Sequence, residues 1–425
     1  WSEWWLFPLL ISSAIAIGMV AGLYPSFYLS SFKPIDVLKG RIQSSARSGS
    51  FRSAMVVFQF TASVVLIIGT FVISRQMNFL LNRDVGFDKE QVMIIEGTHT
   101  LGKKKEVFKD ELLKLSGVDK VSFSGYLPVN GANREGYAFY IEGRENIDES
   151  VSAQKWRVEP DYIETMKMKI VEGRDFDRSV ASDSFGVIIN RTMARELNLK
   201  EPIGTRITNR MGGTGSDYTV IGVVEDFNFQ EMTEPVLPLC RVMERWGDNK
   251  AIVRLKSAHI PGAIESITDK WKQVMPNQPI RYSFLDDRFK KMYDDVLRAG
   301  HIFAGFTTLA IIIACLGLFA LSAFVSEQRS KEISIRRVMG ASIKNIFGLL
   351  TGNFMKLVLI SWIIGTPIAW YAMNEWLRQF AVREPIASDI LLISGLIVAS
   401  IALSTVAYQS IKAAIANPVD NLRQN

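Results

Sequence analysis

The stretch IFAGFTTLAIIIACLGLFALSAFV, residues Ile302–Val325, is apolar along most of its length and holds no acidic residue. An α-helix rises about 1.5 Å per residue, so a segment of this length can cross the roughly 30 Å of hydrocarbon in a bilayer. Four more stretches share this character: Leu6–Leu29, Ala54–Ile73, Phe354–Met373 and Ile390–Ala407. The sequence therefore predicts an α-helical membrane bundle of five transmembrane helices.

A long block with the composition of a soluble domain, Arg75–Gly300, separates the second predicted span from the third. The whole chain is 48% hydrophobic and 22% charged, which averages over these two kinds of segment. Its net charge of +6 would suit nucleic acid, but the basic residues cluster beside the span ends, where topology and anionic lipid explain them. We therefore expect contact with membrane lipid and no nucleic-acid partner.

The short loops indicate the orientation, because Lys and Arg accumulate in cytoplasmic loops. The loops after the first and third spans are both basic, which predicts that they are cytoplasmic and that Arg75–Gly300 lies outside. The C-terminus is then cytoplasmic, in a multi-pass protein of the cell (inner) membrane with an extracytoplasmic or periplasmic domain. The basic residues are Lys33, Lys39, Arg41, Arg47 and Arg52 in one loop and Arg329, Lys331, Arg336, Arg337 and Lys344 in the other.

Hydrophobic periodicity indicates two βαβ units in the outer block. In the first, Gln91–Gly97 and Lys120–Gly125 alternate like strands around the helical pattern of Lys103–Leu115. In the second, Ala251–Lys256 and Ile280–Phe284 alternate around another helical pattern. Two such units separated in sequence predict an extracytoplasmic α+β domain with a split ferredoxin-like (βαβ…βαβ) subdomain.

The region between these units, Tyr126–Gly247, is predicted to be an inserted mixed α/β lobe. Its strand-like stretches, such as Gly186–Asn190 and Tyr218–Val224, are separated by glycine-rich turns. The flanks of the outer block, Ser74–Asn82 and Asp286–Gly300, keep a helical apolar pattern without proline and predict stalk helices that continue the spans. Such stalks either couple the outer domain to the bundle or only space it from the bilayer.

The loop after the third span, SEQRSKEISIRRVMGASIK at Ser326–Lys344, predicts an amphipathic helix. It sets Ile333, Ile335 and Val338 among charged residues and breaks at Gly340. From the pattern alone, this helix either holds the topology at the membrane surface or docks a partner.

The segment Glu327–Ile343 resembles, nearly position for position, the coupling-helix loop of the MacB/FtsX-like family of ABC-transporter permeases. Val158–Tyr162, Glu172–Phe176 and Ile221–Phe227 resemble segments of the family's outer domain. The resemblance implies a non-catalytic permease subunit that couples ATP hydrolysis by a separate cytoplasmic ATPase to movement of the outer domain. ATP and Mg²⁺ would be bound by that ATPase, and this chain would hold no cofactor.

The resemblance also implies partners and docking residues. Beside the ATPase, the partners are a second permease copy or half, forming a dimer, and an extracytoplasmic protein or lipoprotein. Charged side chains of the coupling helix would dock the ATPase, and apolar ones would seat in its groove. The ATPase-docking residues are Glu327, Arg329, Lys331, Glu332, Ile333, Arg336, Arg337, Val338, Met339 and Gly340.

A short repeat supports a duplicated permease, and the family resemblance then implies that the N-terminal part of that permease is missing here. Phe32–Lys39 follows the first span and Ala416–Arg423 follows the last, and both match x-x-Pro-aliphatic-Asp-x-Leu-basic. The expected segments are 1–30, a span ending a preceding half; 31–53, a cytoplasmic linker; 54–85, a span and stalk; 86–285, the MacB-like domain with its lobe at 126–247; 286–325, a stalk and span; 326–345, the coupling helix; and 346–425, two spans and a short cytoplasmic tail.

No catalytic, cofactor or metal site is predicted. Gly97–Lys104 imitates a phosphate-binding loop, but Lys104 stands where Ser or Thr should hold Mg²⁺. His99, His259 and His301 share no ligand spacing. A membrane-anchored sensor or receptor is the alternative function, although its interior segments would be short for a signalling module. A membrane-bound hydrolase would need a catalytic motif that the residues do not supply.

Overall fold

The computed structural model describes residues 4–30, 46–129, 135–144, 150–209, 215–229, 235–243, 249–256 and 260–415. By its contacts the chain divides into two compact units. One comprises Trp1–Gln59, Gly317–Leu357 and Val406–Asn425, and the other comprises Phe60–Leu316 and Val358–Thr405. The two copies of the predicted repeat, Phe32–Lys39 and Ala416–Arg423, lie outside the described residues.

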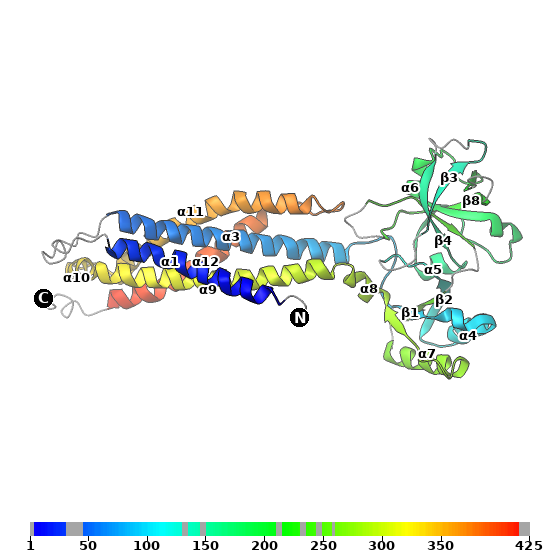
Figure 1. Cartoon of the computed structure of the whole chain (residues 1–425), viewed down its shortest axis with the longest axis horizontal. Helices are drawn as coiled ribbons and strands as arrows, with labels where there is room; N and C mark the ends of the chain where they lie inside the picture. The colour runs from blue at the N-terminus through cyan, green and yellow to red at the C-terminus, as the bar shows by residue number, and fades with distance from the viewer. Residues whose placement is uncertain are drawn as a thin grey trace. The chain divides into compact units, whose positions relative to one another are not determined.

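In the described part of the chain, four helices are long and apolar enough to cross a membrane. They are α3 (Ala46–Asn82), α9 (Asp294–Gln328), α11 (Ile343–Leu377) and α12 (Ser388–Ile415), which Figure 1 labels. A fifth apolar helix, α1, runs from Leu6 to Ser30. Within it, the apolar stretch whose side chains the structure describes is Phe7–Met19, which is shorter than a membrane span requires. The structure thus supports four of the five predicted spans, and the fifth stays a prediction.

The two predicted stalks differ in continuity. Helix α3 runs unbroken through Ser74–Asn82, as its apolar pattern predicted. The other stalk is interrupted at Met292 and Tyr293, between α8 (Leu285–Lys291) and α9. Charge explains the interruption, because α8 ends on basic residues and α9 begins on Asp294 and Asp295. Basic residues stabilise a helix C-terminus and acidic residues an N-terminus, so the charge order favours two helices over one.

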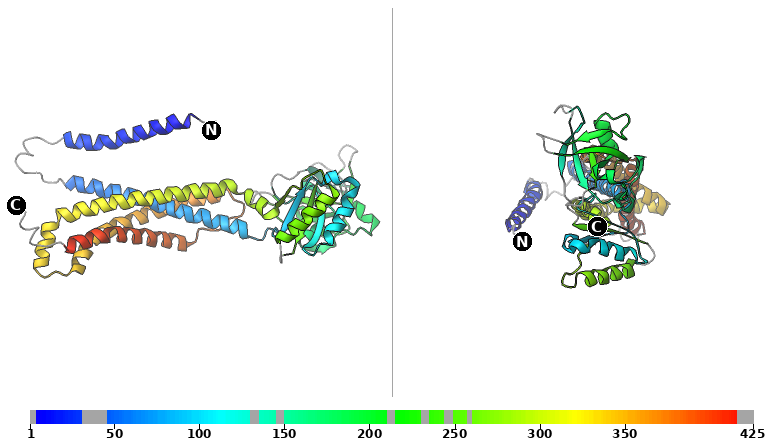
Figure 2. Two further views of the ribbon diagram at one scale, coloured as in Figure 1. Left: turned by 90° about the horizontal axis from the view of Figure 1, so that it is seen from below. Right: turned by 90° about the vertical axis from the view of Figure 1, so that its right-hand side faces the viewer.

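The strands of the two βαβ units form one four-stranded antiparallel sheet in the order β11-β1-β10-β2. Helices α4 and α7 contact each other on one face of this sheet (Figure 2), where Phe108 and Trp271 meet edge to face with ring centroids 5.5 Å apart. The opposite face is also buried, because alternate side chains of β1 point into a second core. The elements are β1 (Val92–Glu96), a 3-10 turn (Thr98–Lys104), α4 (Lys105–Leu113), β2 (Val118–Ser124), β10 (Lys250–Leu255), α7 (Ile260–Val274) and β11 (Tyr282–Phe284).

The inserted lobe is built on a seven-stranded sheet in the order β5-β8-β6-β9-β4-β3-β7. Strand β7 also pairs with β8, so the sheet closes on itself and leaves β5 outside the ring. The lobe contains helices and strands, as predicted, but its helices are short and its closure was not predicted. Its elements are β3 (Gly136–Ile141), β4 (Val151–Arg157), α5 (Tyr162–Thr165), β5 (Ile170–Gly173), η3 (Ala181–Phe185), β6 (Gly186–Asn190), α6 (Arg191–Glu196), β7 (Arg206–Thr208), β8 (Asp217–Val224) and β9 (Leu239–Val242).

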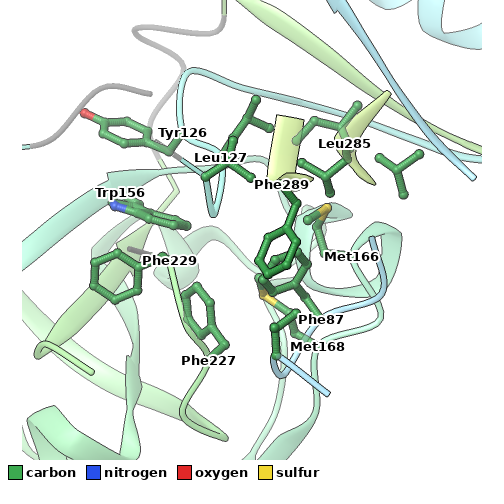
Figure 3. Packing of buried hydrophobic residues seen from close by; sticks show 14 of the residues in the cluster. Phe87, Tyr126, Leu127, Trp156, Met166, Met168, Phe227, Phe229, Leu285 and Phe289 are labelled. Atoms are coloured by element: carbon green, nitrogen blue, oxygen red, sulfur yellow. The ribbon is translucent and has the colours of Figure 1, made fainter. Parts of the chain in front are cut away.

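One apolar core, here called the junction core, joins the lobe, the second face of the four-stranded sheet and both stalks. Figure 3 shows Trp156 beside Phe227 and Phe229, with Phe87 and Phe289 close by. These side chains are buried, so the outer domain rests on the stalks through a dry contact. Its members include Met77 and Leu80 of α3, Val92 and Ile94 of β1, Met166 and Met168 after α5, Leu285 and Phe289 of α8, and Tyr293.

Within the second unit, small and hydroxylated residues bring the long helices close together. The hydroxyls of Thr70 in α3 and Thr307 in α9 are 2.8 Å apart. A Cβ added at Gly365 of α11 would lie 3.0 Å from Cγ1 of Val64 in α3, so the two backbones meet closely. Packing of small residues and hydrogen bonds between helices stabilise helix pairs in a bilayer.

Candidate functional site

The basic loop after α9 folds into a short helix, α10 (Ser330–Val338), labelled in Figure 1. Gly340 ends it with a φ of 95°, a left-handed conformation that glycine adopts readily. Its amide donates to the carbonyl of Arg337, and the amide of Ala341 donates to that of Arg336. This glycine C-cap returns the chain into α11.

One face of α10 packs on α11. Ile333 is 4% exposed and forms a small core with Ile346 and Leu350 of α11, and Ala341 packs against it. Ile333 was expected to seat in the ATPase groove, but this burial corrects that expectation. Its side chain holds α10 against α11 and is not available to a partner.

The other face of α10 carries an exposed apolar stripe. Ile335, Val338 and Met339 are 55%, 69% and 83% exposed. Their spacing of three and four residues puts them on one side of the helix, and Ile333, two positions before Ile335, faces elsewhere. Ile335 was missing from the predicted docking residues, although this spacing could have identified it.

Glu332 and Arg336 of α10 lie beside the stripe. Glu332 accepts a hydrogen bond from Arg336 at 2.7 Å across one helical turn, and both side chains are about half exposed. A pair of this spacing stabilises a helix by roughly 0.3–0.5 kcal/mol. Glu327 is exposed in the last turn of α9, while Arg329 and Arg337 are partly buried. The side chain of Lys331 lies outside the described set.

In Gly97–Lys104, the segment that resembles a phosphate-binding loop, the first two backbone N–H groups are already hydrogen-bonded within the protein. Gly97 and Thr98 both donate their backbone N–H groups to the carbonyl of Asn249, at 3.0 and 3.2 Å. Lys104 donates its ammonium to the carbonyl of Val274. Among the described residues, no group of three or more His, Cys, Asp or Glu side chains could hold a metal ion.

The junction core encloses a charged group, Arg241 of β9. Its guanidinium is fully buried 4.6 Å from the Phe227 ring centroid, and one nitrogen donates to the sulfur of Met168. Burial lowers the pKa of Arg241 to about 10. Nearby, burial raises the pKa of Asp175 to about 6, although a hydrogen bond from the Phe176 amide and the charge of Arg241 oppose this. Ionised Asp175 is therefore unfavourable in the folded protein.

Asp175→Asn is expected to stabilise the protein at pH 8 by about 1–3 kcal/mol, because the amide removes the burial of a charge. A carboxyl whose pKa rises on folding is most favourable below its unfolded pKa and loses stability as pH rises through the folded value. The gain should therefore be full above pH 6 and small near pH 4. Thermal denaturation of the purified chain in detergent at both pH values measures it.

Asp177→Asn is the matched control for that measurement. Hydrogen bonds from Ser179 hold the pKa of the exposed Asp177 below its usual value, so its removal should bring no gain at pH 8. If the gain from Asp175→Asn were equal at pH 4 and pH 8, the buried charge would not be its cause.

The described chain combines helices of membrane-spanning length, a large folded domain inserted between two of them and an exposed amphipathic loop helix. The family model of the MacB-like periplasmic core domain matches residues 53–270, and that of the FtsX-like permease C-terminal domain matches residues 304–418. The chain belongs to the MacB/FtsX-like family of ABC-transporter permeases. It is a membrane protein with an extracytoplasmic domain, from a family of permease components that typically work with a cytoplasmic ATPase.

Several solved structures are similar to part of the chain. The periplasmic region of MacB from Actinobacillus actinomycetemcomitans is 13% identical, with a TM-score of 0.35, over 50% of this chain and 97% of that one. The extracellular domain of the noncanonic ABC-type transporter YknZ from Gram-positive bacteria is 18% identical, with a TM-score of 0.31, over 42% and 87%. A domain of a putative permease protein from Porphyromonas gingivalis is 15% identical, with a TM-score of 0.32, over 46% and 91%. No curated protein sequence matches the chain.

Proposed function

We propose that the chain is a non-catalytic permease subunit that couples ATP hydrolysis by a separate cytoplasmic ATPase to movement of its outer domain. The observation that carries the proposal is the exposed stripe of Ile335, Val338 and Met339 on α10, with the exposed Glu332–Arg336 pair beside it. Exposed apolar side chains in a charged surround are typical of a protein-binding surface. This helix also lies within the residues matched by the FtsX-like model.

The proposed arrangement places α10 and the C-terminus in the cytoplasm and the outer domain on the far side of the inner membrane. The basic residues of the α9–α11 loop favour this orientation. Helix α1 is the fifth span, and a second permease copy or half completes a dimer. We assign the four-stranded sheet with α4 and α7 to the split ferredoxin-like subdomain, because its strand order and its two βαβ units fit that topology.

Movement of the outer domain would be transmitted through the stalks. The junction core supports this step, since it packs Met77 and Leu80 of α3, and Phe289 and Tyr293 of the second stalk, directly into the outer domain. A packed core of this kind transmits displacement instead of absorbing it in a flexible linker. ATP and Mg²⁺ are bound by the partner ATPase in this scheme.

Arg336→Glu combined with Arg337→Glu is expected to abolish co-purification of the ATPase with the chain while leaving membrane insertion intact. The reversal replaces two cationic groups of α10 with anionic ones, and the exposed Arg336 lies beside the apolar stripe, so charge complementarity to the partner is lost. Affinity purification from membranes, with the ATPase detected in the eluate, measures the result.

Two further variants make this result interpretable. Arg336→Glu also breaks the pair with Glu332, so Val338→Ser with Met339→Ser tests the stripe while that pair stays intact. Lys103→Glu with Lys200→Glu makes the same charge change at exposed positions of the outer domain and should leave co-purification unchanged. Co-purification that survives both α10 variants would remove α10 as the docking site.

A further inference from the structure

The segment between α11 and α12 is held to α3 by the side chain of Gln76. The Gln76 amide nitrogen donates to the carbonyl of Val382 at 3.0 Å, and its amide oxygen accepts from the backbone N–H of Glu384 at 3.0 Å. Gln76 is 1% exposed. The buried side-chain amide therefore bonds to the loop backbone as both donor and acceptor, as the backbone of a neighbouring strand would.

Arg75, the preceding residue of α3, makes a second connection to the same segment. Its Nε donates to Glu384 at 2.8 Å, and its Nη1 donates to both carboxylate oxygens of Asp389, at 3.1 and 3.0 Å. Glu384 lies in the loop and Asp389 in the first turn of α12. One guanidinium thus connects α3 to the loop and to α12, and charge-assisted bonds of this type have defined geometry.

Apolar contacts reinforce this polar connection. Phe380, just after α11, is 5% exposed and belongs to the junction core. Its ring lies 4.9 Å from that of Trp376, and Trp376 and Met373 of α11 also pack against the junction core. The outer end of α11 therefore contacts the same core that holds the stalks and the outer domain.

We propose that residues 378–389 form a brace that fixes the outer ends of α11 and α12 to the α3 stalk in one register, so that these parts behave as a single body. Separating them would leave the buried Gln76 amide and the backbone groups of Val382 and Glu384 without partners. The brace is formed entirely by residues of this chain, so the proposal does not depend on whether an ATPase docks at α10.

Distance measurement by pulsed EPR on the full chain in lipid nanodiscs tests the brace. Spin labels are placed at Asn82→Cys, the exposed last residue of α3, and at Ser388→Cys, the exposed first residue of α12. Cys315→Ala removes the partly exposed native cysteine, and Cys240 is buried. We expect one narrow distance distribution, and a broad or bimodal one would overturn the proposal.

Substitutions of Gln76 and Arg75 then test whether their contacts cause the narrow distance distribution. Gln76→Leu should broaden the distribution, while Gln379→Leu, the same change at an exposed position of the loop, should leave it narrow. Arg75→Met, at a side chain 39% exposed, keeps the test available if Gln76→Leu does not fold, and it should also broaden the distribution. Distributions that stay as narrow as the wild type in Arg75→Met and in any folded Gln76→Leu would show that the brace does not hold the helices.

Discussion

Glu159→Gln is expected to lower the free energy of unfolding of the outer domain by about 3 kcal/mol at pH 7. The Glu159 side chain is 9% exposed and lies 3.1 Å from the ammonium of Lys105 and 3.0 Å from that of Lys109. It also accepts a hydrogen bond from the backbone N–H of Phe123. The neutral amide would leave the buried Lys109 with Asp161 as its remaining counter-ion, and an incompletely paired buried charge is strongly destabilising.

The effect of Glu159→Gln should depend on pH. Burial acts to raise the pKa of Glu159, but Lys109 and Lys105 outweigh it and hold the pKa below its usual value. A carboxyl whose pKa falls on folding adds stability above its unfolded pKa and loses it as pH falls through the folded value. The difference from wild type should therefore be full at pH 7 and shrink below about pH 4.5.

Urea denaturation followed by tryptophan fluorescence at pH 7 and pH 4 measures this difference. Glu106→Gln is the control, because Glu106 is 55% exposed and touches the same cluster through Arg178 at 3.5 Å. It should change stability by less than about 1 kcal/mol. Equal losses for the two variants, or a loss independent of pH, would contradict the role given to the buried carboxylate.

Trp156→Ala is expected to destabilise the outer domain by about 3–5 kcal/mol, because it removes the largest side chain of the junction core and leaves a cavity. The Trp156 ring is fully buried, with ring centroids 5.9 Å from Tyr126, 5.6 Å from Phe227 and 5.3 Å from Phe229. Aromatic contacts of this geometry add to the area that they bury. Thermal denaturation monitored by circular dichroism measures the loss.

Two substitutions serve as comparisons for the stability of Trp156→Ala. Trp156→Phe keeps an aromatic ring in the site and should cost less than the alanine variant. Phe185→Ala removes a large aromatic side chain that is 68% exposed, and it should be nearly neutral. A Trp156→Ala protein as stable as Phe185→Ala would mean that the junction core does not support the outer domain.

The elements of the four-stranded sheet were predictable because each has a local period. Strand β1 and helix α4 lie where alternation and helical spacing indicated them. The interruption between α8 and α9 could also have been predicted, because basic residues precede Met292 and acidic residues follow it. The prediction of a continuous stalk considered only the apolar pattern. Local periodicity and local charge therefore account for most of this subdomain.

Contacts between distant segments could not be predicted in the same way. The lobe closes through β7, Arg206–Thr208, which is too short to show a period. Burial of Ile333 depends on Ile346 and Leu350, which come from the next helix. The contacts of Gln76 depend on backbone groups more than 300 positions away in sequence. Each of these features is set by tertiary packing, which leaves no local signal.

The methionine side chains of the junction core have a mechanical consequence. Met77, Met166 and Met168 are buried in it, and Met292 and Met373 pack against it. Methionine is unbranched and has three rotatable bonds, so it can refill space as its surroundings change shape. The junction core can thus stay closely packed through rotamer changes while a displacement passes through it, where a core of branched aliphatic residues would open voids.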